Sequence, residues 1–270
     1  MNVNIIFSFN IYKPEYFENL YNDIKKIFNN ISYLIVINSS DNNVYNILKN
    51  KYINDNTILL NPDIIKKTVF HGSILHGIIS NMKYIINNNI AFKYYILLSN
   101  RTNILPDKVF CKWKKDIYNI EEIDNFGFEN IEELKKLIDK NKIMIKELID
   151  KKEDKICFFN NYKHDTNISV PAWHIGLTNN KSHWNIWSQS LIYKYFKKNN
   201  YLLYATYHEG LFFDYNSINE ILSFFEKNFE LLNNTISFNA AMEEFVLQTL
   251  CANNNLNFAN IRCQRYKFYK

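Results

Sequence analysis

The sequence predicts one α/β domain in which helices flank a mostly parallel β-sheet. The chain has 270 residues, of which 47% are hydrophobic, and this is enough to bury a substantial core. It contains only five Gly and four Pro, which disfavours collagenous chains and all-β folds with many turns. Short apolar runs alternate with helical patterns in the N-terminal half, and this β-α-β alternation is typical of a parallel sheet covered by helices.

Strands and helices alternate from the N-terminus onward. Residues 3–9 (VNIIFSF) form an apolar run that predicts a strand, and the helical spacing of apolar residues after Pro14 predicts a helix. Residues 33–38 (YLIVIN) predict a second strand. The other elements expected in this half are a helix around 44–48, a strand at 57–60, a helix at 74–86 with Ser73 as its N-cap, and a buried strand at 93–99.

The rest of the chain is expected to add helices and shorter strands. Residues 129–152 are charged and have one apolar helical face, so we interpret them as an amphipathic excursion, either a lid or an interaction helix. After it we expect a strand at 156–159, an aromatic-rich helix at 183–196, a strand at 201–205, a helix at 217–231, a helix containing Glu243 and Glu244, and a strand at 260–263. No repeat or linker divides the chain, so we treat 1–270 as a single domain with halves at 1–110 and 153–270.

Composition excludes several classes of protein. The net charge of +5 is spread along the chain, which permits an anionic ligand but does not predict nucleic-acid binding. The four Cys have no C-x-x-C spacing and the six His have no H-x-x-x-H or H-E-x-x-H spacing, so no metal site is predicted. We find no signal peptide and no apolar run near the ~18 residues that a spanning helix needs, and we expect a soluble cytoplasmic protein.

A pair of carboxylates, Glu243 and Glu244, opens what the pattern predicts to be a buried helix. Adjacent helical residues point about 100° apart, so the pair cannot straddle one glycosidic bond as the carboxyls of a glycosidase do. One of the two acting as a lone general base is the more economical interpretation. The alternative is that both acids favour the positive N-terminal end of their helix.

A basic run follows this pair near the C-terminus. It comprises Arg262, Arg265, Lys267 and Lys270. The chain contains no Asp-x-Asp motif, which is the usual holder of a divalent cation in nucleotide-sugar transferases, and fixed cations could stabilise a departing diphosphate instead. A base and such cations are the chemical minimum for an inverting, metal-free glycosyltransferase. A solvated basic tail is the alternative.

Three weaker constellations could line a site. His71 and Gly72 lie at an expected turn into a helix, where free N–H groups suit a phosphate, although an ordinary capped helix uses the same residues. Trp184 and Trp187 could form an aromatic floor for a sugar, or pack in the core. Glu209 follows an expected strand and could bind an acceptor, or serve as a turn residue.

Four collinear segments resemble the core-2/I-branching β-1,6-N-acetylglucosaminyltransferase family, which includes peptide O-xylosyltransferases. Residues 70–75 (FHGSIL) are similar to its W-G-G-x-S-hydrophobic turn, and residues 94–99 (YYILLS) to its D-Y-F-x-x-L-S strand. Residues 182–188 (SHWNIWS) are similar to its S-x-W-x-x-L-S segment, and residues 243–249 (EEFVLQT) resemble D-E-x-x-x-x-T. The absence of disulfide-rich and membrane-anchor patterns makes the chain resemble a divergent soluble member, such as those of bacteria or large DNA viruses.

The resemblance implies a GT-A-like fold with a Rossmann-like sheet, inversion at the anomeric carbon, and no need for a divalent metal. It places the catalytic base on Glu244 and the preceding acid on Glu243, and it implies that basic residues, for which we choose Arg262 and Lys267, hold the diphosphate. The expected partners are a nucleotide sugar, with UDP as the expected carrier, and a glycan hydroxyl. On this interpretation 1–110 binds the nucleotide and 153–270 binds the acceptor.

The expected nucleotide crevice is formed by the loops that follow three predicted strands, those ending near Phe9, Asn38 and Ser99. We expect donor contacts from Phe9, Asn10, Asn38, His71 and Gly72, and acceptor contacts from Glu243, Glu209, Trp184 and Arg101.

One segment departs from the family pattern. Where the family has S-G-x-D-x-P-L, residues 99–105 are SNRTNIL, so Thr102 replaces the acid. This departure supports a second hypothesis, a noncatalytic carbohydrate- or protein-binding module on the same fold. A nucleic-acid-binding protein is a third hypothesis, and it predicts strongly salt-dependent association.

Overall fold

The computed structural model describes residues 2–68, 71–99, 102–104, 156–158, 186–201, 203–205, 208–254, 256, 258–260 and 263–265. The predicted excursion at 129–152 lies outside these residues. Within them, no helix is long and apolar enough to cross a membrane.

A six-stranded sheet is the centre of the fold. Its strands, in spatial order, are β3 (Ile58–Asn61), β2 (Tyr33–Ser39), β1 (Asn2–Ile11), β4 (Ala91–Ser99), β8 (Leu211–Asp214) and β9 (Phe258–Asn260). The first four are parallel, β8 is antiparallel to β4, and β9 is antiparallel to β8. The expectation of an α/β fold with a mostly parallel sheet is therefore confirmed.

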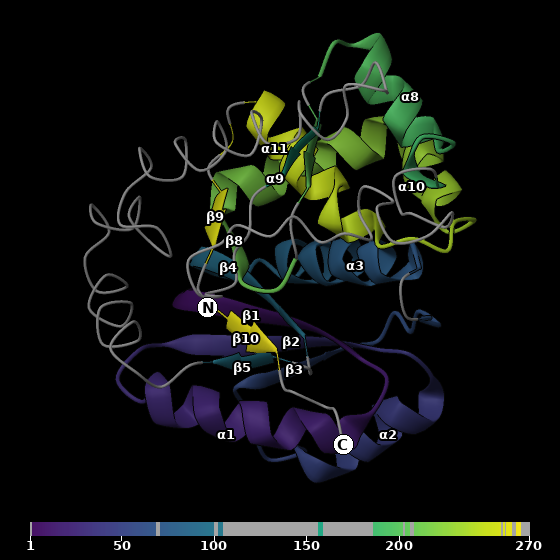
Figure 1. The fold of residues 1–270 in the computed structure, drawn as a ribbon. Coiled ribbons are helices and arrows are strands. Elements are labelled where there is room, and N and C mark those ends of the chain that lie inside the picture. Colours follow the sequence, from purple (N-terminus) through teal and green to yellow (C-terminus); the bar gives the residue numbers. More distant parts are fainter. Residues whose placement is uncertain are drawn as a thin grey trace.

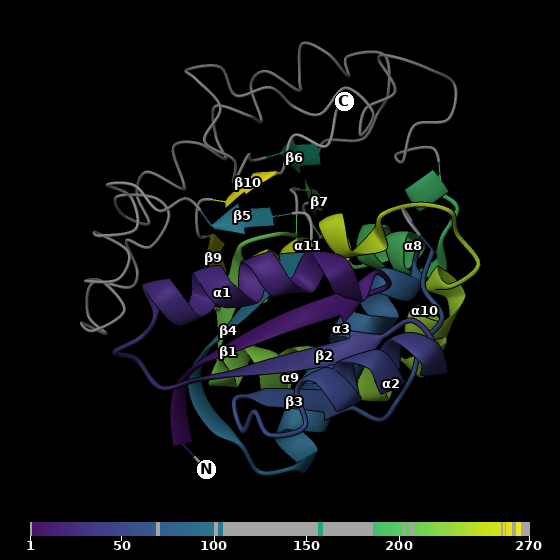
Figure 2. The same cartoon turned by 90° about the horizontal axis from the view of Figure 1, so that it is seen from below.

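Two small sheets lie beside the main one. The strands β5 (Thr102–Ile104) and β10 (Cys263–Arg265) pair antiparallel, and β6 (Ile156–Phe158) and β7 (Leu203–Ala205) pair in parallel. Figure 2 shows β5 and β10 close to α1 (Phe17–Ile27), which agrees with the contacts between α1 and β5.

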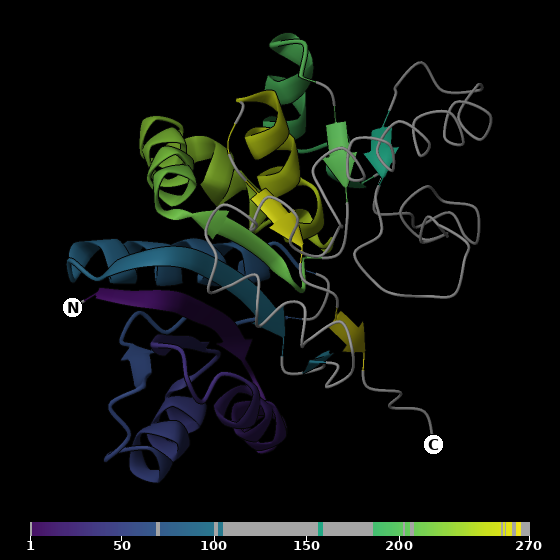
Figure 3. The same ribbon diagram turned by 90° about the vertical axis from the view of Figure 1, so that its left-hand side faces the viewer.

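Helices cover both faces of the main sheet. A 3₁₀ turn, η1 (Pro14–Tyr16), leads into α1, and α1 and α2 (Asn42–Lys51) lie on one face (Figure 1). On the opposite face lie α3 (Ser73–Asn87) and α9 (Tyr215–Lys227), together with α8 (Leu191–Lys198), α10 (Phe229–Thr235) and α11 (Val246–Asn253). Figure 3 shows this layered order from the side.

The alternation of side chains along β1 produces two hydrophobic cores. Phe7 and Phe9 belong to the cluster under α1 and α2, whereas Ile6 belongs to the cluster under α3 and α9. Phe9 packs edge-on against Phe17 of α1, with ring centroids 5.4 Å apart. Because successive strand residues point to opposite faces, Ser8 and Asn10 share the α3 face with Ile6.

Side-chain caps fix the start of three helices. Asp41 Oδ1 accepts from Val44 N at 2.8 Å at the start of α2, and Asp214 Oδ1 accepts from Ser217 N at 2.7 Å at the start of α9. Ser190 caps α8 in the same way. Each such cap stabilises a helix by about 1 kcal/mol.

Several sequence-based boundaries are wrong. The helix expected at 217–231 is two helices, because the backbone of Asn228 (φ −126°, ψ 45°) is not helical and separates α9, which ends at Lys227, from α10. Ser73 is not an N-cap: Gly72 is, and Ser73 Oγ accepts from Thr68 N instead. The strand expected at 260–263 is described only at its two ends: residue 260 ends β9, which pairs with β8, and residue 263 begins β10, which pairs with β5.

The structure differs from the prediction at two further elements. The strand β8 was missed, because four residues before a helix are too few to show a period. Glu243 and Glu244 lie not in an α-helix but in a 3₁₀ turn, η3 (Met242–Glu244), that precedes α11.

Candidate functional site

The sheet changes its direction of winding between β1 and β4. The helices that follow β1 and β2 lie on one face, whereas α3, which leads into β4, lies on the other (Figure 1). In open α/β sheets such a switch point opens a crevice outside the carboxyl ends of the strands, and ligands bind there. The carboxyl ends of β1 and β4 are therefore the expected position of a ligand site.

Three polar residues form a row along this edge. Asn10 of β1 is the register partner of Asn38 of β2 and of Ser99 of β4. Because neighbouring strands are about 4.8 Å apart, the row spans about 10 Å. The structure thus brings together Asn10 and Asn38, two of the residues from which the sequence predicted donor contacts.

Asn10 faces the first turns of α3. Its Nδ2 donates to Ile74 O at 3.0 Å, whereas its Oδ1 is buried and has no hydrogen-bond partner in the described structure. Gly77 makes room for this oxygen, since a Cβ at position 77 would lie 2.1 Å from it. A buried acceptor without a donor costs about 1–3 kcal/mol, so Oδ1 is a candidate acceptor for a ligand.

Behind the row, a buried polar network joins the strand ends to α3. Asn61 Nδ2 donates to Ser80 Oγ at 2.8 Å and to Asn81 Oδ1 at 3.1 Å. Asn81 Nδ2 donates in turn to Ser8 Oγ at 3.1 Å and to Phe9 O at 3.0 Å. Satisfied networks of this kind rigidify a fold, so this one holds α3 in register with β1.

Lys67 places a cation at this edge that the sequence patterns did not predict. Its Nζ bonds to Asn38 Oδ1 and donates to Ser39 O and Ile65 O, both at 3.0 Å. Nothing in the spacing of Lys66 and Lys67 distinguishes them from surface lysines, so the sequence carried no signal. The ammonium ties the segment after β3 to the end of β2.

Burial lowers the pKa of Lys67 from 10.5 to about 7, and the nearby carboxylates Asp63 and Asp41 oppose this shift. Between these two pH values the unfolded chain binds a proton that the folded chain does not. The free energy of unfolding should therefore rise with pH across this window, by at most about 1.4 kcal/mol per pH unit. Below pH 7 the contribution should be constant.

Lys67→Met should remove this component of the pH dependence. Urea denaturation at several values between about pH 6 and about pH 10 measures the slope for both proteins. Lys66→Met is the control, because Lys66 is exposed. Equal slopes for wild type and Lys67→Met would contradict the low pKa of Lys67.

A tight turn brings a second group of residues to the same edge. Gly210 N donates to Leu97 O at 2.7 Å, and Leu211 N donates to His208 O at 3.1 Å. Gly210 has a φ of 85°, which the third position of a type II turn requires and which glycine adopts without strain. The turn places Glu209 beside the end of β4, where Ser99 Oγ donates to its Oε1 at 3.3 Å.

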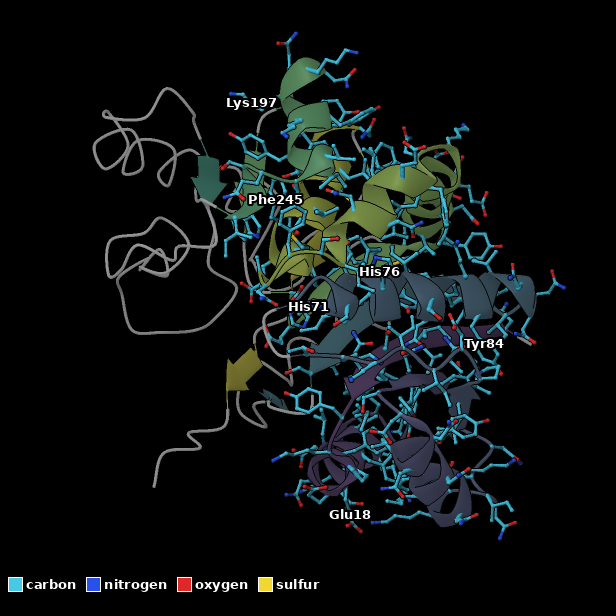
Figure 4. All side chains as sticks on the ribbon, turned by 90° about the vertical axis from the view of Figure 1, so that its right-hand side faces the viewer. Glu18, His71, His76, Tyr84, Lys197 and Phe245 are labelled. Carbon is cyan, nitrogen blue, oxygen red and sulfur yellow. The ribbon has the colours of Figure 1, made fainter. Side chains whose placement is uncertain are left out.

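Glu243 and Glu244 reach this group from η3. The turn η3 contacts α3, and Figure 4 shows Phe245, which follows η3, above the His71 end of that helix. One ligand atom from each of His208, Glu243 and Glu244 lies within 4.8 Å of the other two. Such an arrangement could hold a proton or a metal ion.

The expectation that the two carboxylates point apart is therefore wrong. From the 3₁₀ turn, one oxygen of Glu243 and one of Glu244 come within 4.8 Å of each other and of the same imidazole. Glu243 is 1% exposed and Glu244 is 2% exposed. This is a buried ionisable cluster rather than a pair of acids that serve only the dipole of a helix.

Burial raises the pKa of Glu243 well above its ordinary value, and the neighbouring Glu244 and Glu209 raise it further. His208 Nδ1 lies 3.6 Å from Glu243 Oε1 and 3.8 Å from Glu209 Oε2, both too long for a hydrogen bond. Perturbed carboxyls of this kind are concentrated at functional sites.

Gly72 and Ser73 do not have the free N–H groups that were expected for a phosphate. Gly72 N donates to Phe238 O at 3.1 Å. Ser73 N donates to His71 Nδ1 at 3.0 Å. The expectation of free donors is thus wrong for Gly72 and Ser73, and the alternative of an ordinary helix start describes this segment.

Phe9 and Trp187, the two predicted aromatic site residues that the structure describes, lie in the core. Phe9 is 1% exposed and faces α1, so its side chain does not line the crevice. Trp187 is fully buried and stacks on Phe245 with ring centroids 5.1 Å apart, which confirms core packing for this residue.

Four of the predicted site residues lie outside the described residues: Trp184, Arg101, Arg262 and Lys267. The proposed roles of these residues stay predictions. Comparison of the sequence with protein-family models and with curated proteins gives no match.

Proposed function

We propose that the protein is an inverting glycosyltransferase that moves a sugar from a nucleotide donor, with UDP as the expected carrier, to a hydroxyl of a glycan. One observation carries this proposal: Glu209, whose Oε1 accepts from Ser99 Oγ at the switch point of the sheet, lies next to the buried group His208, Glu243 and Glu244. A nucleotide at the strand ends and a base in the cluster would then be neighbours.

Glu244 is the proposed base. Its carboxylate takes the proton of the acceptor hydroxyl while the hydroxyl oxygen attacks the anomeric carbon of the donor. The bond from that carbon to the diphosphate breaks, and the nucleoside diphosphate leaves with the electron pair. Because Glu244 is 2% exposed, the acceptor must bring its hydroxyl to a carboxylate that bulk water hardly reaches, and a desolvated carboxylate is a stronger base.

The order of the strands supports a GT-A-like form of the α/β fold, with the nucleotide at the ends of β1 and β2. Asn10 and Asn38 are the donor contacts that this arrangement favours, and Phe9, His71 and Gly72 receive less support from their surroundings. Arg262 and Lys267 remain the proposed holders of the diphosphate, in place of a divalent metal.

Isothermal titration calorimetry with UDP in the presence of EDTA tests the proposal most directly. We expect binding without metal, followed by release of free UDP when the right donor and acceptor are supplied. A donor screen that measures free UDP identifies the sugar. No binding of any nucleoside diphosphate, with or without metal, would contradict the proposal.

A second candidate function is a noncatalytic carbohydrate- or protein-binding module on this fold. The burial of both Glu243 and Glu244 favours this binding module, because a carboxylate that no substrate reaches cannot act as a base. Binding of a glycan without any binding of nucleotide would support the module over the enzyme.

Gly77→Ala should weaken nucleotide binding while the fold is retained. The added Cβ would lie 2.1 Å from Asn10 Oδ1 and 2.7 Å from Lys67 Cε, so both side chains must move. We expect UDP affinity to fall by about tenfold, which corresponds to about 1.4 kcal/mol. Asn87→Ala, at the exposed far end of α3, is the control, and unchanged affinity in Gly77→Ala would argue against a donor site at Asn10.

A further inference from the structure

Two buried atoms in the group His208, Glu243 and Glu244 have no hydrogen-bond partner among the residues that the structure describes. They are Glu243 Oε2 and His208 Nδ1. Glu243 is only 1% exposed. Within the described part of the chain, His208 is the basic side chain that lies in ion-pair range of Glu243. A buried carboxylate in this position is strongly unfavourable unless a proton or a cation neutralises it.

The types and spacing of these groups match those of a transition-metal site. Imidazole nitrogen and carboxylate oxygen bind Zn²⁺ at about 2.0–2.2 Å, which places ligand atoms about 3.4 Å apart in a tetrahedron. His208 Nδ1 and Glu243 Oε1 are already 3.6 Å apart, and one ligand atom from each of His208, Glu243 and Glu244 lies within 4.8 Å of the other two. Shifts of about 1 Å in side chains would close the triad around one ion, and water could complete the coordination.

We propose that His208, Glu243 and Glu244 form a binding site for a divalent transition-metal ion, and that an ion bound there keeps Glu244 from acting as a base. The first half is independent of the proposed function, whereas the second half rests on it. Coordination to a dication strongly lowers the basicity of a carboxylate, so it is a much poorer acceptor for the proton of an acceptor hydroxyl. Metal would therefore inhibit transfer, and a chelator would restore it.

The surroundings of the triad favour an ion over an empty cluster. Two carboxylates supply two negative charges to a dication, which brings the net charge of the buried group near zero. Glu209, whose Oε2 lies 3.8 Å from His208 Nδ1, adds a third carboxylate next to the imidazole. Because Glu209 faces the ring nitrogen that would bind the metal, it adds negative charge beside the ion.

Zinc binding by the full chain is the first test. Calorimetric titration with Zn²⁺, and the visible spectrum with Co²⁺ as a probe, should show one equivalent bound in wild type. His208→Asn and Glu243→Gln should each weaken the affinity by at least about tenfold. Glu220→Gln, which changes an exposed glutamate of α9, should leave it unchanged, and circular dichroism reports whether each variant is folded.

Two results would overturn the metal site. No Zn²⁺ binding near neutral pH would mean that a proton neutralises the cluster, and full binding in both His208→Asn and Glu243→Gln would place the zinc on other residues.

Inhibition is the second test. UDP release by wild type should fall when Zn²⁺ occupies the site, and EDTA should restore it. Stoichiometric binding with undiminished UDP release would overturn the inhibitory half and leave the site itself in place. If the protein releases no UDP under any condition, the proposed function fails, while the titrations with the variants still decide whether the metal site exists.

Discussion

Glu244→Gln is expected to abolish sugar transfer. The amide keeps the size of the side chain and cannot accept the proton of the acceptor hydroxyl, so the step that forms the nucleophile is lost. A positioned general base contributes about 10²- to 10⁴-fold to the rate, and kcat should fall by at least the lower figure. Release of free UDP in the presence of donor and acceptor measures the effect.

Nucleotide binding separates this result from a simple loss of structure. The row Asn38, Asn10 and Ser99 belongs to the sheet rather than to η3, so UDP affinity in Glu244→Gln should stay within about twofold of wild type, less than about 0.5 kcal/mol. Glu220→Gln is the matched control for the change of charge. Turnover equal to that of wild type would show that Glu244 is not the base.

Gly72→Ala is expected to cause the largest loss of stability among the variants considered. An added Cβ would lie 2.0 Å from Thr235 O and 2.5 Å from Thr235 C, and both are main-chain atoms that end α10. Gly72 has a φ of −55°, which alanine adopts easily, so the effect is steric and not one of backbone strain. The start of α3 and the end of α10 must separate.

Overpacking of this kind costs about 1–3 kcal/mol, and we expect a value near 3 because main-chain atoms cannot move aside alone. The melting temperature should fall by roughly 5–10 °C, as measured by differential scanning calorimetry.

Gly77→Ala is the matched comparison in the same helix. There the new Cβ meets the ends of two side chains. The higher helix propensity of alanine also stabilises the helix by about 1 kcal/mol relative to glycine. Gly77→Ala should therefore lose much less stability than Gly72→Ala. A melting temperature of Gly72→Ala within about 1 °C of wild type would contradict the close approach of α3 and α10.

Local pattern was enough for the first half of the fold. The strands β1, β2 and β4 are long apolar runs, and α3 has a clear apolar stripe, so their existence and order could be predicted from period alone. Asn10 and Asn38 could be predicted as neighbours, because the carboxyl ends of adjacent parallel strands meet at one edge.

The candidate site required more than pattern. Glu209 and the Glu243–Glu244 pair are more than thirty residues apart in sequence, and they meet because β8 pairs antiparallel with β4 and because η3 packs on α3. Lys67 carries no spacing signal, and the space that Gly72 and Gly77 leave is defined by residues distant in the chain.

The sequence by itself determined the α/β class, the alternation of elements and the presence of an acidic pair before a buried helix. Only the tertiary structure decided that this pair converges on His208, that Trp187 belongs to the core and that the N–H groups of Gly72 and Ser73 are already used. The physical reason is that the two kinds of information depend on contacts of different range along the sequence. Periodicity reports which face of an element is buried, whereas the pKa of a carboxyl and the partner of an N–H group depend on atoms that long-range packing brings within a few ångströms.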